Sequence, residues 1–317
     1  MMTHSLMLLS AISPLHNGAG EGMGMIDRPI IRERTTDFPI IQGSTLKGVF
    51  RDAYAPGVNA KVRDHCTTNR IDQTKVIDWL FGPFENGSDH AGCISFGDAA
   101  VLAFPVRALK GSFVWATSPF VLYRFQRIAG MAGVNIPTLQ SLLDSPQLAA
   151  MGDDTVLVNP ASQNRFNING KILLEEYPLN ITPCEKLLPD FAAAIGRIAF
   201  DTPSFQTEFA NKLVVIPDDR FKYFVRYATE VTANIRIRDD TGTTKDGSLR
   251  YTEYLPSETV LYSLLSFSKP FSSAAHTVFN DAASVQTFMI GNRPERGIIQ
   301  VGGDETKGKG FTYFSFV

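Results

Sequence analysis

Residues 15–34 read LHNGAGEGMGMIDRPIIRER, and this stretch guides the interpretation of the rest of the chain. Four glycines fall within seven residues, so we expect neither a helix nor a regular strand here. Glycine is favoured where φ is positive or where another group must approach the backbone closely. Asp27 follows the glycines, and three arginines stand within the next seven residues. The stretch therefore predicts a backbone-lined loop that carries one acid and several cations.

A second glycine-rich segment stands near the end of the chain, where residues 302–310 read GGDETKGKG. Its four glycines again allow close approach to the backbone, and its two lysines add positive charge. We interpret both segments as backbone-lined sites for a polyanion.

The composition limits the class of protein. A chain of 317 residues can bury a large core as one domain or two. The net charge of -2 gives no overall attraction to nucleic acid, so any basic surface must be local. Three cysteines without a CxxC pair suggest a reducing compartment, and the apolar residues 5–15 are too short to span a bilayer. We expect a cytoplasmic protein with no membrane partner.

Residues 38–54 contain the pattern of an amphipathic helix that starts near Ser44. Its predicted apolar face consists of Leu46, Val49, Phe50 and Ala53. Ser44 is a suitable N-cap, and Lys47 and Arg51 stand four residues apart on another face. A helix start presents free N–H groups and the positive end of the dipole, which suits a phosphate. An ordinary solvated basic stripe explains the segment about equally well.

The remaining segments give a mixed sequence of helices and strands. Strands are predicted at 4–13, 93–96, 100–106, 112–115, 220–237 and 311–317. Helices are predicted at 72–81, 119–128, 136–150, 185–199, 255–267 and 280–289. Residues 55–69 are polar and predicted to be an irregular exposed insertion. A turn cluster at 239–247 lies between the segment 220–237 and the returning strand 249–255, which predicts a protruding β-hairpin.

Common catalytic motifs are missing from the sequence. It contains no Walker lysine loop, GxSxG, HExxH or dinucleotide glycine fingerprint, so nucleotide hydrolysis, acyl transfer and hydride transfer are disfavoured. A Cys₂His₂ zinc set could be assembled from His65, Cys66, His90 and Cys93, but the spacing matches no standard module. Four ordinary loop residues are the alternative.

Asp27 is the strongest candidate for chemistry. It stands between glycines and phosphate-binding arginines, where a carboxylate would repel RNA unless it held a metal ion or transferred a proton. A structural acid paired with Arg28 or Arg32 is the alternative. His16, eleven residues earlier, could join the same site or be merely packed.

The chain resembles the RAMP proteins of CRISPR systems, and within them the family of the fourth, backbone subunit of the type III-B effector, the Cmr complex. The resemblance runs nearly end to end, through the stretches 15–34, 40–48 (IIQGSTLKG), 81–82, 92–99 (GCISFGDA), 104–107, 117–119, 251–256 (YTEYLP) and 302–310. Each motif is weak alone, but their order is specific.

This resemblance implies a fold and a domain division. The family core is an α+β, ferredoxin-like or RRM-type palm with finger insertions and a protruding β-hairpin thumb. We expect a single RAMP domain over 1–317. Its palm would comprise about 1–54, 92–128 and 255–317, with insertions at about 55–91 and 129–215 and the thumb at about 218–254.

The resemblance also implies an activity. Several copies would coat the guide RNA (crRNA) as a helical filament with other subunits of the complex. The thumb of each copy would displace a base pair of the guide–target duplex. The complementary target RNA would be cut beside each displaced pair in a reaction that requires a divalent metal, Mg²⁺ or Mn²⁺, and no organic cofactor. The essential family aspartate falls on Asp27, which would also hold the metal, with His16 and Glu253 as suspected helpers.

The predicted RNA contacts lie in both glycine-rich segments and at the helix start. They are Gly18, Gly20, Gly22, Arg32, Arg34, Ser44, Thr45, Lys47, Arg51, Gly302, Gly303, Lys307 and Lys309. An architectural subunit without cleavage of its own remains open, with Asp27 serving only the loop. The metal-independent guide-processing nuclease of the superfamily is a third possibility, which the hairpin and the Asp-bearing loop disfavour.

Overall fold

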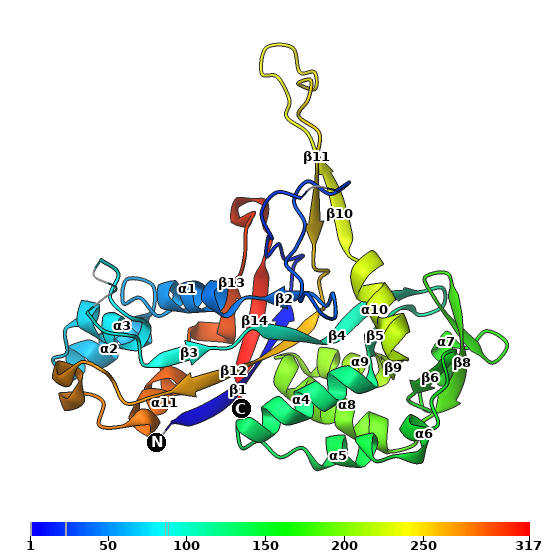
Figure 1. Ribbon diagram of the computed structural model, residues 1–317, viewed down its shortest axis with the longest axis horizontal. Coiled ribbons are helices and arrows are strands. Elements are labelled where there is room, and N and C mark those ends of the chain that lie inside the picture. Colours follow the sequence, from blue (N-terminus) through cyan, green and yellow to red (C-terminus); the bar gives the residue numbers. More distant parts are fainter. Residues whose placement is uncertain (1, 23, 86, 88) are drawn as a thin grey trace.

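The computed structural model describes residues 2–22, 24–85, 87 and 89–317, so Met23 of the predicted glycine-rich loop lies outside the described residues. Helices and strands are both abundant, which confirms the predicted α+β class. Figure 1 shows a broad body built around a twisted sheet, from which one long hairpin projects. No helix among the described residues is long and apolar enough to cross a bilayer.

The strands are β1 (Thr3–Ala11), β2 (Ile40–Ile41), β3 (Ile94–Phe96), β4 (Ala99–Ala108), β5 (Ser112–Thr117), β6 (Thr155–Val158), β7 (Lys171–Leu174), β8 (Tyr177–Pro183), β9 (Leu213–Val215), β10 (Glu230–Asn234), β11 (Arg250–Tyr254), β12 (Val260–Phe267), β13 (Ile298–Gln300) and β14 (Phe311–Phe316). The α-helices are α1 (Gly43–Ala53), α2 (Ala60–Thr68), α3 (Gln73–Phe81), α4 (Pro119–Met131), α5 (Pro137–Leu143), α6 (Pro146–Ala149), α7 (Gln163–Phe166), α8 (Leu187–Ala199), α9 (Pro203–Lys212), α10 (Asp218–Tyr227) and α11 (Ala282–Gly291). Short 3₁₀ helices cover Ser273–Thr277, Glu295–Gly297 and Glu305–Lys307.

Twelve strands of the described chain form one sheet in the order β13-β14-β1-β12-β4-β5-β9-β6-β8-β7, with β2 beside β4 and β3 beside β12. A further pairing of Ala108 with Leu174 joins β4 to β7, so β4, β5, β9, β6, β8 and β7 close into a barrel-like ring. β1 is antiparallel to β12 and β14, and its residues from Ser5 onward are buried. A strand covered on both faces favours an uninterrupted apolar run, which residues 6–9 (LMLL) provide.

Helices cover both faces of the sheet around β1. On β14, the ring of Phe314 lies 4.8 Å from that of Phe50 in α1, while the next residue, Ser315, donates to the carbonyl oxygen of Ile198 in α8 at 2.7 Å. Successive residues of a strand point to opposite faces, so α1 and α8 lie on opposite sides of the sheet. The first strand therefore passes through the core and delivers residues 12–39 to the upper edge of the body (Figure 1).

The protruding hairpin predicted from the sequence is confirmed. β10 and β11 pair from Glu230 with Tyr254 to Asn234 with Arg250, and residues 235–249 form an exposed tip beyond them. In Figure 1 the hairpin stands clear of the body, with α10 leading into it.

Two predicted elements have the wrong type. Residues 255–267 were expected to form a helix, but they contain the turn after Pro256 and then β12, a central strand. Residues 220–227 were expected to begin a strand, but they belong to helix α10, because the buried residues Phe221, Phe224 and Val225 have helical spacing. Only residues 230–234 of the predicted segment 220–237 are strand.

Three further expectations need correction. Residues 55–69 are not irregular, because α2 buries Val62 and Cys66 one turn apart and Asn59 caps it. The N-cap of α1 is Gln42 rather than Ser44, since the helix begins at Gly43. Residues 136–150 form two helices, α5 and α6, because Pro146 begins a new one.

Candidate nucleic-acid interface

Three segments distant in sequence meet at the root of the hairpin: residues 15–34 (the glycine loop), residues 302–310 (the C-terminal loop) and β11. Leu15 and Leu255 exchange two backbone hydrogen bonds of 2.9 and 2.8 Å. Further along, the N–H of Arg28 donates to the carbonyl oxygen of Tyr251, and the N–H of Glu253 donates to that of Arg28. The glycine loop thus lies along the free edge of β11, which fixes the direction in which the hairpin projects.

His16 joins all three segments. Its Nδ1 lies 2.8 Å from the carbonyl oxygen of Glu253 in β11, and its own carbonyl oxygen accepts from the N–H of Gly303 at 2.9 Å. A carbonyl oxygen only accepts, so Nδ1 carries the proton and Nε2 is left as the acceptor in the neutral ring. Gly18 lies directly against Nε2, since a Cβ there would be 2.7 Å from it. The two glycine-rich segments therefore meet at this histidine.

A cleft of about 710 Å³ opens between the two loops, α1 and the hairpin root. Of the predicted RNA contacts, it brings together Gly18, Gly20, Thr45, Gly302 and Gly303, with His16 beside them. Two cations that were not assigned as RNA contacts, Arg28 and Arg250, also line it, together with Glu21. We call this space the loop cleft.

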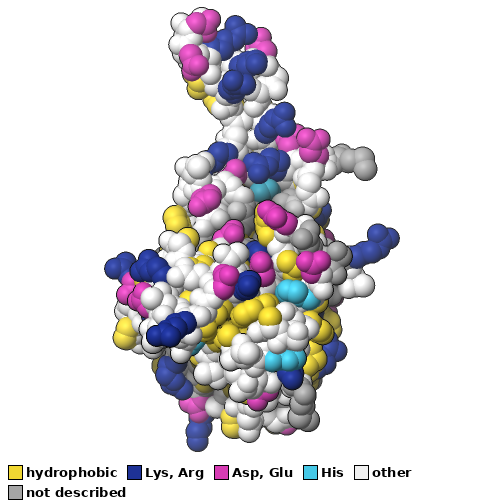
Figure 2. Space-filling view, turned by 90° about the vertical axis from the view of Figure 1, so that its left-hand side faces the viewer, with side chains coloured by type: hydrophobic (Ala, Val, Ile, Leu, Met, Phe, Trp, Pro, Cys, Tyr) yellow, Lys and Arg dark blue, Asp and Glu magenta, His cyan; other side chains and the backbone are white. Residues whose placement is uncertain are grey.

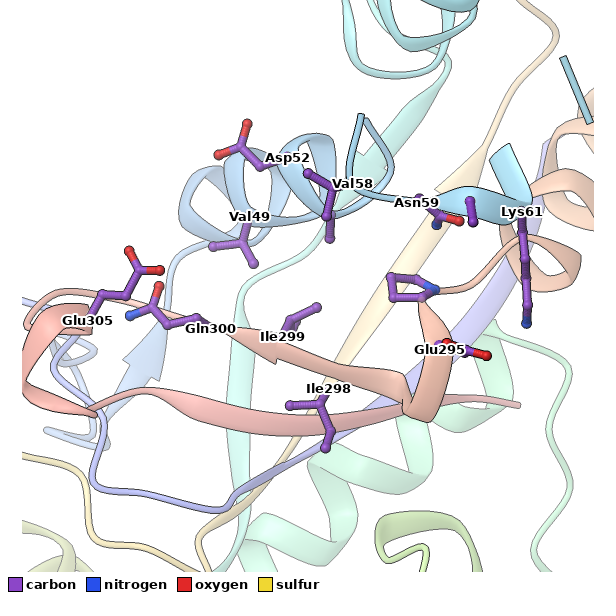
Figure 3. Close-up of a pocket in the computed structure, with 13 residues that line it drawn as sticks. Val49, Asp52, Val58, Asn59, Lys61, Glu295, Ile298, Ile299, Gln300 and Glu305 are labelled. Carbon is purple, nitrogen blue, oxygen red and sulfur yellow. The ribbon is translucent and has the colours of Figure 1, made fainter. Parts of the chain in front are cut away.

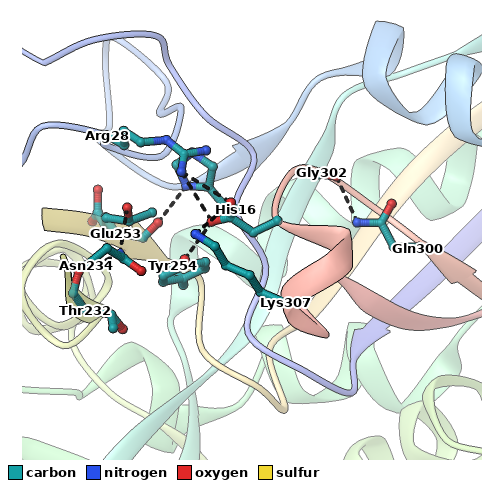
Figure 4. A network of polar contacts seen from close by, with 11 residues as sticks. His16, Arg28, Thr232, Asn234, Glu253, Tyr254, Gln300, Gly302 and Lys307 are labelled. Carbon is teal, nitrogen blue, oxygen red and sulfur yellow. Dashed lines mark hydrogen bonds and ion pairs between the residues drawn. The ribbon is translucent and has the colours of Figure 1, made fainter. Parts of the chain in front are cut away.

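Asp304 is the centre of a polar network at the floor of this region. Arg28, Tyr254 and Lys307 all direct donors at its carboxylate, at 3.3, 2.7 and 3.3 Å (Figure 4). Burial alone would raise the pKa of Asp304, but these donors outweigh it and hold that pKa below its ordinary value. Burial and the same carboxylate raise the pKa of Tyr254 to about 12. The network is therefore charged at neutral pH and ties the C-terminal loop to β11.

Asp27 lies at the outer side of the glycine loop, partly exposed at the base of the hairpin. Its Oδ2 accepts from the N–H of Tyr251 at 2.7 Å. Neither alternative partner holds it, because Arg28 binds Asp304 and Arg32 binds Glu253. No other hydrogen bond to its carboxylate exists among the described residues, so Asp27 retains acceptor capacity.

Arg32 and Glu253 form an internal pair rather than two surface groups. The Arg32 guanidinium donates to Glu253 at 2.5 Å and to the carbonyl oxygen of Val225 at 2.9 Å. The Glu253 carboxylate also accepts from the N–H of Ile30 and from Thr229 Oγ1. Both side chains are almost fully covered. The pair holds the glycine loop against the hairpin root, and neither group is positioned to reach RNA.

The predicted phosphate site at the start of α1 is only partly present. The N–H of Gly43 already binds the carboxylate of Asp98 at 2.7 Å. Arg51 turns away to Asp78 and to the carbonyl oxygen of Gly82, so it is a structural residue in this arrangement. Thr45 faces the loop cleft. Ser44 and Lys47 line a separate depression of about 520 Å³ on the other flank of the helix start.

The remaining predicted contacts differ in exposure. Arg34 and Gly20 are exposed, whereas the N–H of Gly22 closes a turn by donating to the carbonyl oxygen of Asp27. Lys309 places its ammonium 4.9 Å from the centre of the Tyr254 ring, and Lys307 is the half-exposed partner of Asp304. Sequence reasoning missed Asp304 and Tyr254 as organising residues, although both stand in the quoted motifs.

A second depression, of about 510 Å³, lies on the far side of the C-terminal loop. Figure 3 shows its apolar lining from α1 and β13, with Asp52, Glu295 and Glu305 at its rim. Lys61 is its one lining cation among the described residues. An acidic rim repels phosphate, which makes the loop cleft the better candidate for a polyanion.

The proposed zinc set is not assembled. His65 packs edge-on against Phe288 at 5.0 Å, and His90 Nδ1 contacts the carbonyl oxygen of its neighbour Ala91. Burial raises the pKa of Cys66, and it raises the pKa of Cys93 to about 12, which disfavours a thiolate. The described part of the chain contains no group of three ligating side chains.

Comparison with known proteins gives one consistent family. The sequence matches the RAMP superfamily over residues 8–314. It is 37% identical over 310 residues to "CRISPR system Cmr endoribonuclease Cmr4" of Pyrococcus furiosus, covering 96% of this chain and 92% of that protein. The structure superposes on the crystal structure of oligomeric Cmr4 from Pyrococcus furiosus with a TM-score of 0.70 and 29% identity, covering 100% of this chain and 99% of that one. A similar score of 0.70, at 20% identity and covering 99% and 96%, relates the fold to a chain of a type III-B Cmr-beta complex bound to cognate target RNA.

Proposed function

Because the chain belongs to the RAMP superfamily, we propose that it is a backbone subunit of a type III-B CRISPR effector complex. Several copies coat a guide RNA as a helical filament and cut the complementary target RNA at regular intervals. The 37% identity to an endoribonuclease over nearly the whole chain supports both parts of this proposal. Sequence selection comes from guide–target pairing, while the protein holds backbone and shape.

The observation that carries the proposal is the meeting of the two glycine-rich loops and the hairpin at one cleft. Gly302 has φ of 83°, and a Cβ there would lie 2.3 Å from the carbonyl oxygen of His16. The backbones of the glycine loop and the C-terminal loop are therefore in direct contact. The same loop that lines the cleft carries Asp27 to the base of the hairpin, where a strand paired to the guide would pass.

The guide backbone runs across the start of α1. The loop cleft and the depression beside Ser44 and Lys47 flank this helix start, so one continuous phosphate chain can contact both. Exposed glycines of the loops admit the backbone, and Arg28 and Arg250 in the loop cleft and Lys47 in the depression supply positive charge. The proposed guide contacts therefore lie on a local basic surface, although the chain as a whole has a net charge of -2.

Cleavage is assigned to Asp27. In a distorted target strand, the 2′-hydroxyl can align with its own 3′-phosphate and attack the phosphorus, which forms a 2′,3′-cyclic phosphate. The bond to the 5′-oxygen of the next nucleotide breaks, and that oxygen takes a proton from water and leaves as a hydroxyl. We propose that Asp27 accepts the proton of that hydroxyl or would hold a divalent cation, Mg²⁺ or Mn²⁺. The cation would stabilise the negative charge that develops on the phosphate. One carboxylate suits this role because Mg²⁺ commonly combines one or two carboxylates with substrate phosphates and water.

Glu253 and His16, the suspected helpers, act by holding the glycine loop and with it Asp27. Glu253 orients the glycine loop through Arg32 and the N–H of Ile30. His16 fixes the same loop to β11 and Gly303, and its Nε2 faces the loop cleft beside Gly18. Both residues keep Asp27 at the hairpin base rather than contacting the target phosphate.

We extend the proposal to the palm, thumb and fingers of the fold. The strands β1, β12, β14 and β4 with α1 form the ferredoxin-like palm, and residues 218–254, which are α10 and the hairpin, form the thumb. The insertions form the fingers, with the boundaries expected from the sequence. Three buried free cysteines are consistent with a cytoplasmic location.

The test is cleavage by the assembled complex with guide RNA and labelled complementary target. Asp27→Ala is expected to reduce the cleavage rate by at least about 100-fold, the lower range for loss of a general base or metal ligand. Assembly and target binding should be retained. Asp64→Ala, which removes an exposed acid of α2, is the matched control and should cut normally.

One observation favours a second candidate, a purely architectural subunit. The Asp27 carboxylate accepts from the N–H of Tyr251, so the residue could serve only to hold the hairpin. Asp27→Asn separates the two, because an amide oxygen still accepts that hydrogen bond but carries no charge. The proposed cleavage role predicts that Asn is as inactive as Ala. Normal cleavage by the Asn variant would establish the architectural role.

A further inference from the structure

Three tyrosines form a row on the flank of the hairpin root, away from the loop cleft. The ring centres of Tyr177 and Tyr223 are 4.8 Å apart, and those of Tyr223 and Tyr227 are 4.9 Å apart. The guanidinium of Arg220 lies 4.8 Å from the Tyr177 ring at the inner end of the row. Tyr227, the last residue of α10, forms the outer end.

Tyr227 has no role in the core. Tyr177 and Tyr223 pack against the hydrophobic cluster, whereas Tyr227 does not and leaves 69% of its surface exposed. It borders a depression of about 350 Å³ with Tyr223, Arg107, Glu175, Glu176 and Thr229. We call this depression the tyrosine pocket.

The charges of the tyrosine pocket are paired internally. Arg107 binds Glu175 at 2.8 Å, and the hydroxyl of Tyr223 donates to Glu176 at 2.7 Å. Two carboxylates against one guanidinium make the pocket unsuitable for phosphate. Aromatic faces beside both donors and acceptors suit a nucleobase, whose π-face stacks and whose edge carries polar groups.

The pocket also lies next to the cleavage region. The glycine loop pairs with β11, β11 pairs with β10, and β10 follows α10, so the glycine loop and α10 lie on opposite sides of the hairpin root (Figure 1). The glycine loop lines the loop cleft, and Tyr223 and Tyr227 of α10 line the tyrosine pocket. Thr229, in the pocket wall, donates to Glu253 at 2.8 Å, and Glu253 holds the glycine loop. Tyr227 is therefore an exposed aromatic side chain next to the root of the hairpin.

We propose that the tyrosine pocket is a nucleobase-binding subsite, in which Tyr227 stacks on an unpaired base of the target RNA. This inference rests on the proposed function, because it assumes that a duplex passes the hairpin. Stacking would hold the unpaired base out of the duplex and slow its return. Any base can occupy the subsite because every base has a π-face.

The experiment uses the assembled complex with guide RNA and targets that carry 2-aminopurine at one position at a time. At positions where the base is unpaired, stacking on Tyr227 is expected to quench fluorescence, so Tyr227→Ala should be several-fold brighter there. Tyr227→Phe keeps the ring and should resemble the parent. Tyr123→Ala, which removes a half-exposed tyrosine of α4 outside the pocket, should also resemble the parent.

A second arm asks whether the base itself is the ligand. With a short target containing one such position, Tyr227→Ala should weaken binding by about 5- to 150-fold, the range of one base–aromatic stack. With an abasic nucleotide at that position, the parent and the variant should bind equally. A loss of binding that persists with the abasic target would overturn the subsite.

Three other outcomes are distinguishable. If Tyr227→Ala breaks the filament, as seen by mass photometry, with no dependence on the base, the pocket is a protein contact and the inference fails. If the parent complex neither binds nor cuts complementary RNA, the proposed function fails first. If it cuts normally and the fluorescence of every variant is the same, only the subsite is lost.

Discussion

Gly302 allows the C-terminal loop to lie directly against the glycine loop. Its positive φ favours glycine, and a Cβ would meet the carbonyl oxygen of His16. Gly302→Ala is therefore expected to lower the free energy of unfolding by at least about 1–2 kcal/mol, from the left-handed backbone alone. Gly303→Ala is the matched control, since its nearest neighbour would be 3.6 Å away. Thermal denaturation of both variants measures the difference, and equal midpoints would contradict the described contact.

Glu258 gives the fold a pH dependence. It occupies the turn before β12 with φ of 71°, and burial raises the pKa of its carboxyl from 4.5 to about 7. Between these pH values the folded state binds more protons than the unfolded state, so this group makes stability fall as pH rises through 4.5 to about 7. Glu258→Gln should match the parent near pH 4 and exceed it near pH 8 by on the order of 1 kcal/mol, after solvent screening.

Denaturant unfolding at a series of pH values measures the Glu258 effect. An increase in stability that is the same at every pH would show that the neutral amide acts through packing or through the strained turn, and not through the carboxyl proton.

The sequence predicted the site residues whose role depends on the backbone. It did not predict which partners the charged side chains would bind. The glycine spacing near residue 20 and in the C-terminal loop indicated close backbone approach, and Asp27 stood out as an acid among cations. The sequence could not show that Arg32 would turn inward to Glu253, 221 positions away. Nor could it show that Arg51 would bind Asp78. An arginine looks the same in sequence whether it faces phosphate or a buried carboxylate.

At the scale of elements, the hairpin is a separable part of the molecule. The tip at 235–249 is almost wholly exposed, and Ile235, Ile237 and Leu249 each leave about half of their surface uncovered. Replacing the tip with Asn-Gly should therefore leave the thermal midpoint unchanged while retaining the five β10–β11 pairs.

The shortened hairpin should still assemble on guide RNA but should no longer unpair target bases beside it. Fluorescence of 2-aminopurine in the target reports the unpairing, and the cleavage pattern reports its consequence. Undiminished unpairing and cleavage at regular intervals would show that the hairpin tip does not act on the duplex.

The elements that the sequence assigned wrongly share a physical cause. β12 is buried on both faces, so its sequence VLYSLLSF lacks the alternation of a half-exposed strand and resembles a buried helix. In α10, aromatic residues at alternate positions imitate a strand, but Phe221 and Phe224 are core residues while Tyr227 is not. Burial, which decides both cases, is set by the neighbouring elements. The glycine loop, α3 and the hairpin carried local turn and cap signals and were predicted correctly.

The whole molecule combines a nearly neutral charge with local basic surface. Figure 2 shows Lys and Arg side chains gathered on the projecting hairpin with Asp and Glu side chains among them. The tip contains Arg236, Arg238 and Lys245 but also three aspartates, so it has no net charge to hold it on a phosphate chain. The proposed function therefore assigns steady attachment to RNA to the loop cleft and the start of α1, and action on the duplex to the hairpin.

The central claim is that the two glycine-rich loops grip the guide while Asp27 faces the target strand. Electron cryomicroscopy of the Asp27→Ala complex with guide RNA and uncut target tests it most directly. The account predicts guide phosphates in the loop cleft against Gly18 and Gly302, and a target phosphate within a few ångströms of residue 27. Guide density along the acidic depression beside Asp52 and Glu295, with residue 27 far from any target phosphate, would contradict it.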